Sequence, residues 1–291
     1  MKVFGIDVSK WQGNFDFEKA KSEGVKFAIL RGAYTSPSIR LNGGKDLKFD
    51  EYYQNAKEQG LNVGVYQYSM AQTVAQAKKE AEFLYEHVLK GKQFELPIYI
   101  DVEDAVQMNL GKRNLTNIIK AWCEYLESKN YFVGVYSTKF WFKNYMYDNE
   151  LLRYTHWIAQ WTSACTYEHT NVLGMWQFGG ETNLIRSNKI AGVVCDQDYM
   201  FQDFPTMIKT RKLNGFDKTI ATEIKPKIKV GDLVNISKDA VYYNGKAIPS
   251  WVKSKKWYVK SILGKRAVID KDENKSYSIC SPINTKFLST N

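Results

Sequence analysis

The sequence lacks several features that would point to common classes of protein. It has no apolar run near the roughly 18 residues that a membrane-spanning helix needs, so we expect no membrane insertion. At the N-terminus only residues 3–6 are apolar before Asp7 interrupts them, which predicts no signal peptide. We therefore expect a protein that begins in the cytosol.

Cysteine and histidine are scarce. None of the four cysteines forms a Cys-x-x-Cys pair, which argues against a disulfide framework or a zinc site. The three histidines are too far apart for metal-ligand spacing. These absences disfavour histidine chemistry and predict no cofactor and no resident metal, so carboxylates are the first candidates for catalysis.

The net charge of +10 is unevenly distributed. Residues 1–208 carry 23 basic and 24 acidic side chains, whereas residues 209–291 carry 18 basic and 7 acidic ones. Such a division is typical of two domains with different functions. The basic part is expected to bind a polyanion, which leaves nucleic acid, anionic lipid and an anionic cell-wall polymer as candidates.

Short apolar runs alternate with helical patterns through the first two thirds of the chain. This alternation is typical of parallel strands with crossover helices, in either an α/β barrel or a doubly wound sheet. The helical patterns fade after the fifth strand, which favours a lopsided barrel with helices mainly in its first part. The expected strands are 3–6, 26–31, 63–69, 97–103, 131–137, 156–161, 173–178 and 193–198, and the expected helices are 15–23, 46–59, 73–90 and 114–129.

The pattern changes after residue 208. Residues 1–208 are the predicted first domain, and the basic stretch 209–229 is predicted to be a linker. Beyond it, residues 230–291 contain short strand-like runs and an Asn244-Gly245 turn signal, without a helical pattern. We expect this part to be a small all-β barrel.

Acidic residues stand at the ends of three predicted strands. Asp7 ends the first, Asp101 and Glu103 end the fourth, and Asp196 and Asp198 lie near the end of the last. Catalytic residues of a parallel barrel gather at the carboxyl ends of its strands. Clustered carboxylates raise the pKa of at least one member, which is how glycosidases obtain a general acid.

Two other interpretations of these acids remain open. A single acid at a strand end is more often solvated or a helix cap, and Asp104 is the expected example. Clustered oxygens also suit magnesium or calcium, although no phosphate-binding loop accompanies them.

Aromatic and amide side chains are the second candidate group. Tyr66 and Tyr68 face one way on the third strand, and Tyr136, Trp161 and Gln177 lie at the ends of later strands. Aromatic faces stack on sugar rings, while hydroxyl and amide groups pair with sugar hydroxyls and acetamides. For each ring taken singly, core packing is an equally good explanation.

Seven short motifs fall in order within residues 1–205, at the ends of the predicted strands. The motifs are GIDVSKWQG at 5–13, FAILRG at 27–32, GVYQYS at 64–69, DVE at 101–103, WIAQW at 157–161, MWQF at 175–178 and the aspartates of CDQD at 195–198. These motifs resemble those of glycoside hydrolase family 25, the muramidases of bacteria and their phages. The resemblance implies a flattened β/α barrel that lacks helices in its later part.

The resemblance also implies an activity and roles for the acids. The activity is hydrolysis of the β-1,4 bond between N-acetylmuramic acid and N-acetylglucosamine. Glu103 would be the general acid, and Asp101 would orient the 2-acetamido group or act as the second catalytic carboxylate. Asp7 and Asp196 would tune these groups and position water, with Asp198 standing where the family usually has asparagine.

From VGDLV at 230–234 onward the chain resembles the Src-homology-like barrels attached to Gram-positive cell-wall hydrolases. Together the resemblances imply a phage endolysin that waits in the host cytoplasm, then acts on the cell wall. Its expected partners are bacterial peptidoglycan and, through the basic domain, an anionic wall polymer.

A non-catalytic glycan-binding protein on a degenerate barrel is the alternative function. A nucleic-acid-binding protein is disfavoured because no groove-entering helix pattern is present.

Overall fold

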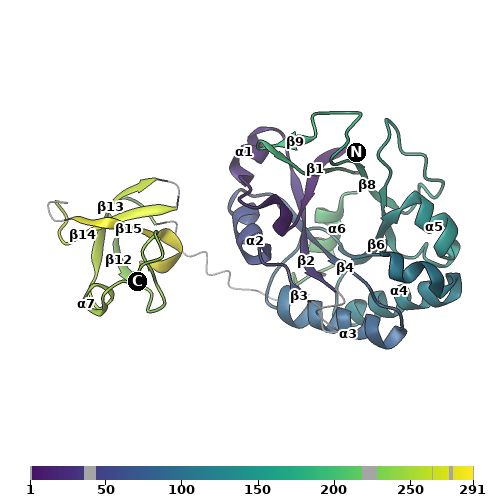
Figure 1. The fold of residues 1–291 in the computed structure, drawn as a ribbon, viewed down its shortest axis with the longest axis horizontal. Coiled ribbons are helices and arrows are strands. Elements are labelled where there is room, and N and C mark those ends of the chain that lie inside the picture. The colour runs from purple at the N-terminus through teal and green to yellow at the C-terminus, as the bar shows by residue number, and fades with distance from the viewer. Residues whose placement is uncertain (1, 36–43, 218–227, 264, 275–277, 291) are drawn as a thin grey trace. The chain divides into compact units, whose positions relative to one another are not determined.

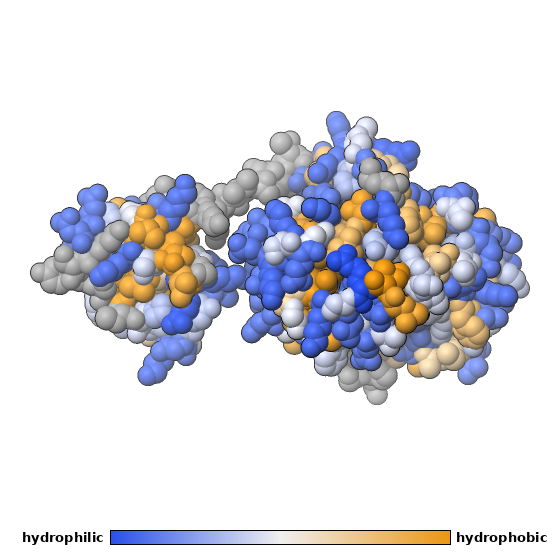
Figure 2. Space-filling view, turned by 90° about the horizontal axis from the view of Figure 1, so that it is seen from above, coloured by the Kyte–Doolittle hydropathy of each residue, from blue (hydrophilic) through white to orange (hydrophobic). Residues whose placement is uncertain are grey.

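The computed structural model describes residues 2–35, 44–217, 228–263, 265–274 and 278–290. The chain divides into two compact units, Met1–Ile220 and Ala221–Asn291. Within the described residues, no helix is both long and apolar enough to cross a membrane. Figure 2 shows that hydrophobic residues gather in places on the visible faces of both units, among a majority of hydrophilic ones.

Eight strands of the first unit close into a barrel (Figure 1). Each expected strand is present in the expected order, so the predicted fold class is confirmed. Seven strands run parallel, and β1 pairs with β2 to close the barrel. The strands are β1 (Val3–Val8), β2 (Phe27–Tyr34), β4 (Asn62–Tyr68), β5 (Ile98–Asp101), β6 (Val133–Thr138), β7 (Thr155–Ala159), β8 (Leu173–Gly179) and β11 (Asp196–Met200).

Crossover helices cover only part of this barrel. Between β7 and β8, and between β8 and β11, the chain forms loops and one short ladder of β9 (Lys189–Ile190) with β10 (Val193–Val194). The asymmetry agrees with the fading helical pattern of the sequence. The helices are α1 (Phe17–Ser22), α2 (Phe49–Glu58), α3 (Val74–Leu84), α4 (Lys112–Glu127), α5 (Lys139–Tyr145) and α6 (Phe204–Thr210).

Shorter elements complete the first unit. The edge strand β3 (Gly44–Lys45) pairs antiparallel with β2, and α3 continues into one π-helical turn, η3 (Tyr85–Leu89). Three 3₁₀ turns are η1 (Lys10–Gln12), η4 (Ala105–Leu110) and η5 (Asp148–Glu150).

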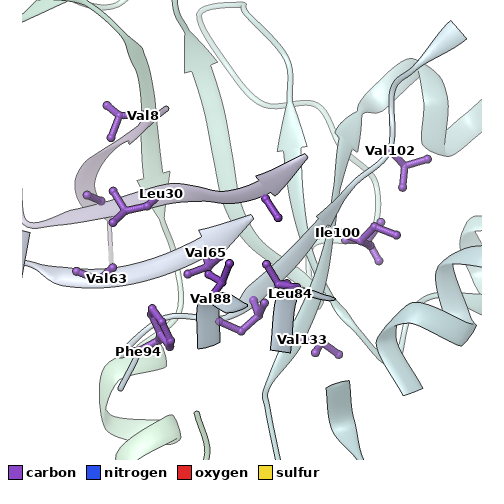
Figure 3. Packing of buried hydrophobic residues seen from close by; sticks show 14 of the residues in the cluster. Val8, Leu30, Val63, Val65, Leu84, Val88, Phe94, Ile100, Val102 and Val133 are labelled. Carbon is purple, nitrogen blue, oxygen red and sulfur yellow. The ribbon is translucent and has the colours of Figure 1, made fainter. Parts of the chain in front are cut away.

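Apolar side chains form two layers around the strands. The outer layer lies between strands and helices, where Val65 of β4 lies beside Leu84 and Val88 (Figure 3). The inner layer fills the barrel with side chains from several strands, and α6 adds Phe204 and Ile208 to it. The barrel is therefore a packed core with room for a site only at an end.

The last strand differs from the prediction. We expected parallel strands throughout, with Asp196 and Asp198 at the carboxyl end of the eighth. Instead β11 runs antiparallel to both β1 and β8, and Asp196 is its first residue. An antiparallel strand brings its start, rather than its end, to the edge where the parallel strands finish. The acids still reach the expected face of the barrel, but for a different reason.

The predicted linker is wrong in its first part. Residues 218–227 lie outside the described residues, but 209–217 belong to the barrel unit. Asn214 is fully buried: its amide donates to the Leu96 carbonyl at 2.8 Å and accepts from the Phe132 amide at 2.6 Å. An Asn-Gly pair in a basic stretch predicts an exposed turn, yet here the amide satisfies two buried backbone groups.

The second unit contains a five-stranded antiparallel sheet, as expected for an all-β part, with strand order β15-β14-β13-β12-β16. Gly245 has φ +82° in the predicted turn, where the Tyr242 amide donates to the Lys246 carbonyl at 2.9 Å. Two short helical turns and the last two strands were not predicted from the sequence. The elements are β12 (Leu233–Ile236), α7 (Ser250–Lys253), β13 (Trp257–Leu263), β14 (Arg266–Asp270), β15 (Ser278–Asn284), η6 (Thr285–Phe287) and β16 (Leu288–Ser289).

Candidate active site

An open cleft of about 210 Å³ lies at the barrel end where the parallel strands finish. Asp7, Asp101, Glu103 and Asp196 all line it, so the structure brings together the four acids proposed from the sequence. They come from β1, from β5 and the turn after it, and from β11. Residues nearly 190 positions apart in the chain thus share one acidic surface.

Asp7 lies near the end of β1 and is almost fully buried, with 5% of its surface exposed. Its Oδ2 accepts a hydrogen bond from Gln177 Nε2 at 2.8 Å. Burial raises the pKa of Asp7 well above its usual value, and the nearby charge of Asp198 raises it further. Glu103 adds a smaller contribution in the same direction. Asp7 therefore keeps its proton to higher pH than a solvated aspartate does.

Asp101 is the last residue of β5, and Glu103 follows two residues later. Their separation along the chain directs both side chains toward the cleft, as the sequence predicts. Burial raises the pKa of Asp101 well above its usual value, followed by the charges of Glu103 and Asp7, while Arg31 opposes the shift. Burial also raises the pKa of Glu103, and Asp104 adds to that shift. A protonated carboxyl at the cleft surface is the requirement for a general acid.

Asp104 is a helix cap, as expected. Its Oδ1 accepts from the Val106 amide at 2.9 Å at the start of η4, and its Oδ2 accepts from the Tyr68 hydroxyl at 2.8 Å. The sequence did not predict its second effect, because its charge raises the pKa of Glu103.

The two aspartates of β11 occupy different positions. Asp196 lines the cleft, and burial, followed by the charges of Asp7 and Glu103, raises the pKa of Asp196 to about 8. Asp198 is fully buried and accepts a hydrogen bond from Trp157 Nε1 at 2.8 Å. A Cβ atom at Gly180 would lie 1.9 Å from Asp196 Oδ1, so the chain needs a glycine there for Asp196 to keep this place.

Gln177 connects two of the other predicted sugar-binding side chains with Asp7. Its Oε1 accepts from the Tyr136 hydroxyl at 3.0 Å and from Trp161 Nε1 at 3.1 Å. Because both contacts are donors, the amide nitrogen must point the other way, toward Asp7. The network thus fixes the orientation of the Asp7 carboxyl.

The predicted sugar-binding residues do not all line the cleft. Tyr66, Tyr68, Tyr136 and Gln177 line the cleft. Trp161 is not among the lining residues; its ring is 40% exposed and approaches Gly180 next to the cleft. Tyr136 also packs against Trp157, with ring centroids 4.4 Å apart, so it belongs to the core and to the site at once.

Six lining residues were missed as site candidates, and the three with the largest side chains are Arg31, Trp157 and Trp11. Arg31 ends the second predicted strand, so the strand-end argument applied to acids would have found it. Its Nε pairs with Asp46 Oδ2 at 2.8 Å, while its Nη2 has no hydrogen-bond partner among the described residues. Trp11 is 75% exposed beside the cleft.

The turn that carries Trp11 is held by a reciprocal cap. The Ser9 amide donates to Gln12 Oε1 at 2.9 Å, and the Trp11 amide donates to Ser9 Oγ at 3.4 Å. A ring on a fixed turn loses little conformational freedom when a ligand stacks on it. Trp11 is therefore a further candidate for sugar contact.

The metal interpretation finds no geometric support. Over the described ranges, no group of three or more His, Cys, Asp or Glu side chains is arranged to hold a metal ion.

Comparisons with known proteins concern the family and the fold of this chain. A family model described as Glycosyl hydrolases family 25 matches residues 6–185. The autolytic lysozyme of Clostridium acetobutylicum is 26% identical over 149 residues, which are 50% of this chain and 40% of that protein. The chain thus matches less than half the length of this curated relative.

Solved structures share the barrel. The bacterial lysozyme from Streptomyces coelicolor has a TM-score of 0.61 against this chain, at 20% identity, over 74% of this chain and 98% of that one. The CTP1L endolysin has a TM-score of 0.58 at 21% identity, over 72% of this chain and 69% of that one. At these identities the likeness establishes the fold of the first unit.

Proposed function

Since the chain belongs to glycosyl hydrolase family 25, we propose that it is a lysozyme that hydrolyses the glycan strands of bacterial peptidoglycan. The observation that supports this most directly is Glu103, a cleft carboxyl whose pKa is raised by burial, set beside three other acids. The similarity to an autolytic lysozyme supports the same substrate.

The proposed reaction begins with proton transfer from Glu103. Its proton passes to the glycosidic oxygen as the bond from that oxygen to the anomeric carbon breaks. Asp101 orients the 2-acetamido group or acts as the second catalytic carboxylate, and water then adds to the anomeric carbon. Asp7 and Asp196 position that water and tune the pKa values of Glu103 and Asp101. The Glu103 carboxylate, which has lost its proton, takes a proton from that water and so returns to its protonated form.

We propose the β-1,4 bond between N-acetylmuramic acid and N-acetylglucosamine as the bond cleaved. Digestion of purified peptidoglycan followed by mass analysis of the new ends tests this. We expect reducing muramic acid ends. Reducing glucosamine ends would show the other glycosidic specificity, and free amines without new reducing ends would show an amidase or peptidase. Binding without any release would favour the non-catalytic alternative.

The second unit is proposed to hold the enzyme on the wall through an anionic polymer. Four aromatic residues of this unit, Tyr242, Tyr243, Trp251 and Trp257, are candidates for contact with a wall ligand. Trp257 is buried and Tyr242 packs on the core, whereas Trp251 is 58% exposed and Tyr243 46% exposed. Each exposed ring has a cation near it: Lys255 Nζ lies 5.8 Å from the Trp251 ring centre. Cations beside stacking faces suit a phosphate-bearing sugar polymer.

We further propose that the protein acts in host lysis as a phage endolysin, in the host cytoplasm first and on the wall afterwards. A solved structure with the same barrel is an endolysin by name. Expression in a susceptible bacterium tests this proposal. Lysis is expected only after the membrane is permeabilised from outside, and lysis without permeabilisation would contradict a cytoplasmic store.

A further inference from the structure

Asp198 presents an unusual arrangement of hydrogen bonds. It is 0% exposed, and its Oδ1 accepts from Trp157 Nε1 at 2.8 Å. Its Oδ2 is buried and has no donor among the described residues. A buried ionised carboxylate usually has several donors or a cation, because the charge is costly to bury.

The neighbour of Asp198 across the strands is Asp7. In the antiparallel β1–β11 pair, Asp198 stands opposite Gly5, and Asp7 stands opposite Asp196. Asp7 is therefore the diagonal neighbour of Asp198 on the same face, within reach of its side chain. The charge of Asp198 raises the pKa of Asp7, so the two carboxyl groups lie within electrostatic reach of each other.

Two ionised carboxylates so placed repel each other and cannot hydrogen-bond to each other, since both only accept. One proton between them removes the difficulty: it supplies the missing partner of Asp198 and leaves one negative charge on the pair. Gln177 already donates to Asp7, and Trp157 donates to Asp198, so each carboxyl keeps one further donor.

The other groups around Asp198 do not supply a positive charge. The titratable groups whose charges interact with it are Asp7, Asp196, Cys195 and Tyr99, and each is neutral or negative. No ion pair to Asp198 occurs within the part of the chain described. Burial, before any other cause, raises the pKa of Asp198 well above its usual value.

We propose that Asp7 and Asp198 share a single proton, and that Asp198 is thereby the positioning residue for Asp7. The inference deepens the proposed hydrolase site, and its kinetic test rests on that function. The proton links β1 to β11 and keeps Asp7 aimed at the cleft. When the proton is lost, two buried negative charges repel and Asp7 moves from its place.

Asp198→Asn is the sharpest variant, because an amide donates to Asp7 permanently and still accepts from Trp157. We expect kcat/KM within about threefold of the wild type at pH 6. We expect the alkaline limb of the pH profile to move upward by about one pH unit, since the variant has no such proton to lose. Asp198→Ala removes the donor and should lower kcat/KM by about 10–100-fold at every pH.

Infrared spectroscopy tests the proton without any activity. At pH 6 the difference spectrum between the wild type and Asp198→Asn should show loss of one protonated carboxyl band, whereas Asp50→Asn, at an exposed aspartate, should show none. Failure of the hydrolase proposal would leave this result intact. The inference is overturned if no protonated carboxyl disappears, or if Asp198→Asn has the pH profile of the wild type while hydrolysing peptidoglycan.

Discussion

The two units place their charged side chains in opposite environments. In the barrel unit, Asp7 and Asp101 are buried at the end of the strands, and burial is the first cause of their raised pKa values. In the second unit, Lys255 and Lys256 are exposed, and Lys255 lies near the exposed ring of Trp251. Burial raises the pKa of a carboxyl, so that it can hold the proton that acid catalysis requires. Exposure leaves the charge of a lysine accessible to an anionic polymer.

The comparison also explains why the charge division of the sequence is only approximate. The basic excess begins at residue 209, but Lys209, Arg211 and Lys212 belong to the barrel unit that ends at Ile220. The cations expected to meet the wall are therefore those of the sheet unit. Substitutions confined to one unit therefore test whether catalysis and wall binding are divided between the two units.

The largest effect is expected from Glu103→Gln. The variant keeps the size of the side chain but has no proton to donate, so wall lysis should fall by about 10²–10⁴-fold. Turbidity of a wall suspension measures the activity, and circular dichroism checks the fold. Lysis near the wild-type rate in a folded variant would remove Glu103 from its role.

Gln177→Ala should have the next largest effect. It removes the amide that donates to Asp7 at 2.8 Å and accepts from Tyr136 and Trp161. We expect kcat/KM on soluble glycan fragments to fall by about 10–100-fold through misplacement of Asp7. Gln54→Ala, at an exposed amide of α2, serves as the control. Equal activity of the two variants would show that the network does not hold the site.

Asp196→Asn should stabilise the barrel unit while lowering activity. The folded pKa of Asp196, about 8, lies above its unfolded value, so the folded state binds more protons between about pH 4 and 8 and loses stability as pH rises. Removing this group should raise the free energy of unfolding by about 1–3 kcal/mol at pH 8 and above, with little change near pH 4. Urea unfolding at both pH values measures it, and a gain confined to pH 4 would contradict the assignment.

A smaller effect is expected from replacing Lys253, Lys255 and Lys256 with alanine. Exposed charges are screened over about 8 Å at physiological salt, so binding to purified walls should weaken several-fold at low salt and less at high salt. A matched variant with three exposed lysines of the barrel unit replaced (Lys26, Lys78 and Lys79) should bind as the unchanged chain does. Equal loss in both variants would assign binding to net charge alone.

The smallest effect is expected from a chelator, which should leave hydrolysis unchanged because the proposed chemistry uses carboxyl groups alone. Loss of activity that returns on adding magnesium or calcium would favour the metal interpretation of the acidic cluster.

The parts that were predictable from the sequence depend on local patterns. The eight strands follow from short apolar runs, and Asp101 with Glu103 follows from their spacing at the end of one run. The direction of β11 depends on how the chain returns after β8, across loops with no helical pattern, so local patterns could not predict it.

Other features depend on contacts between distant residues. Asn214 looks like part of an exposed turn until its amide is seen to bind backbone groups near residues 96 and 132. Asp198 looks like a second catalytic candidate until the structure places it beneath the cleft, against Trp157. Such roles are set by packing and cannot be assigned from spacing alone.

The division of function between the units is tested most directly by measuring binding and cleavage in the same two variants. Sedimentation with purified walls reports binding, and release of reducing ends from soluble peptidoglycan fragments reports cleavage. We predict that Glu103→Gln binds walls normally and does not cleave, while the variant with alanine at 253, 255 and 256 cleaves fragments normally and binds walls weakly. Loss of both properties in either variant would contradict the account.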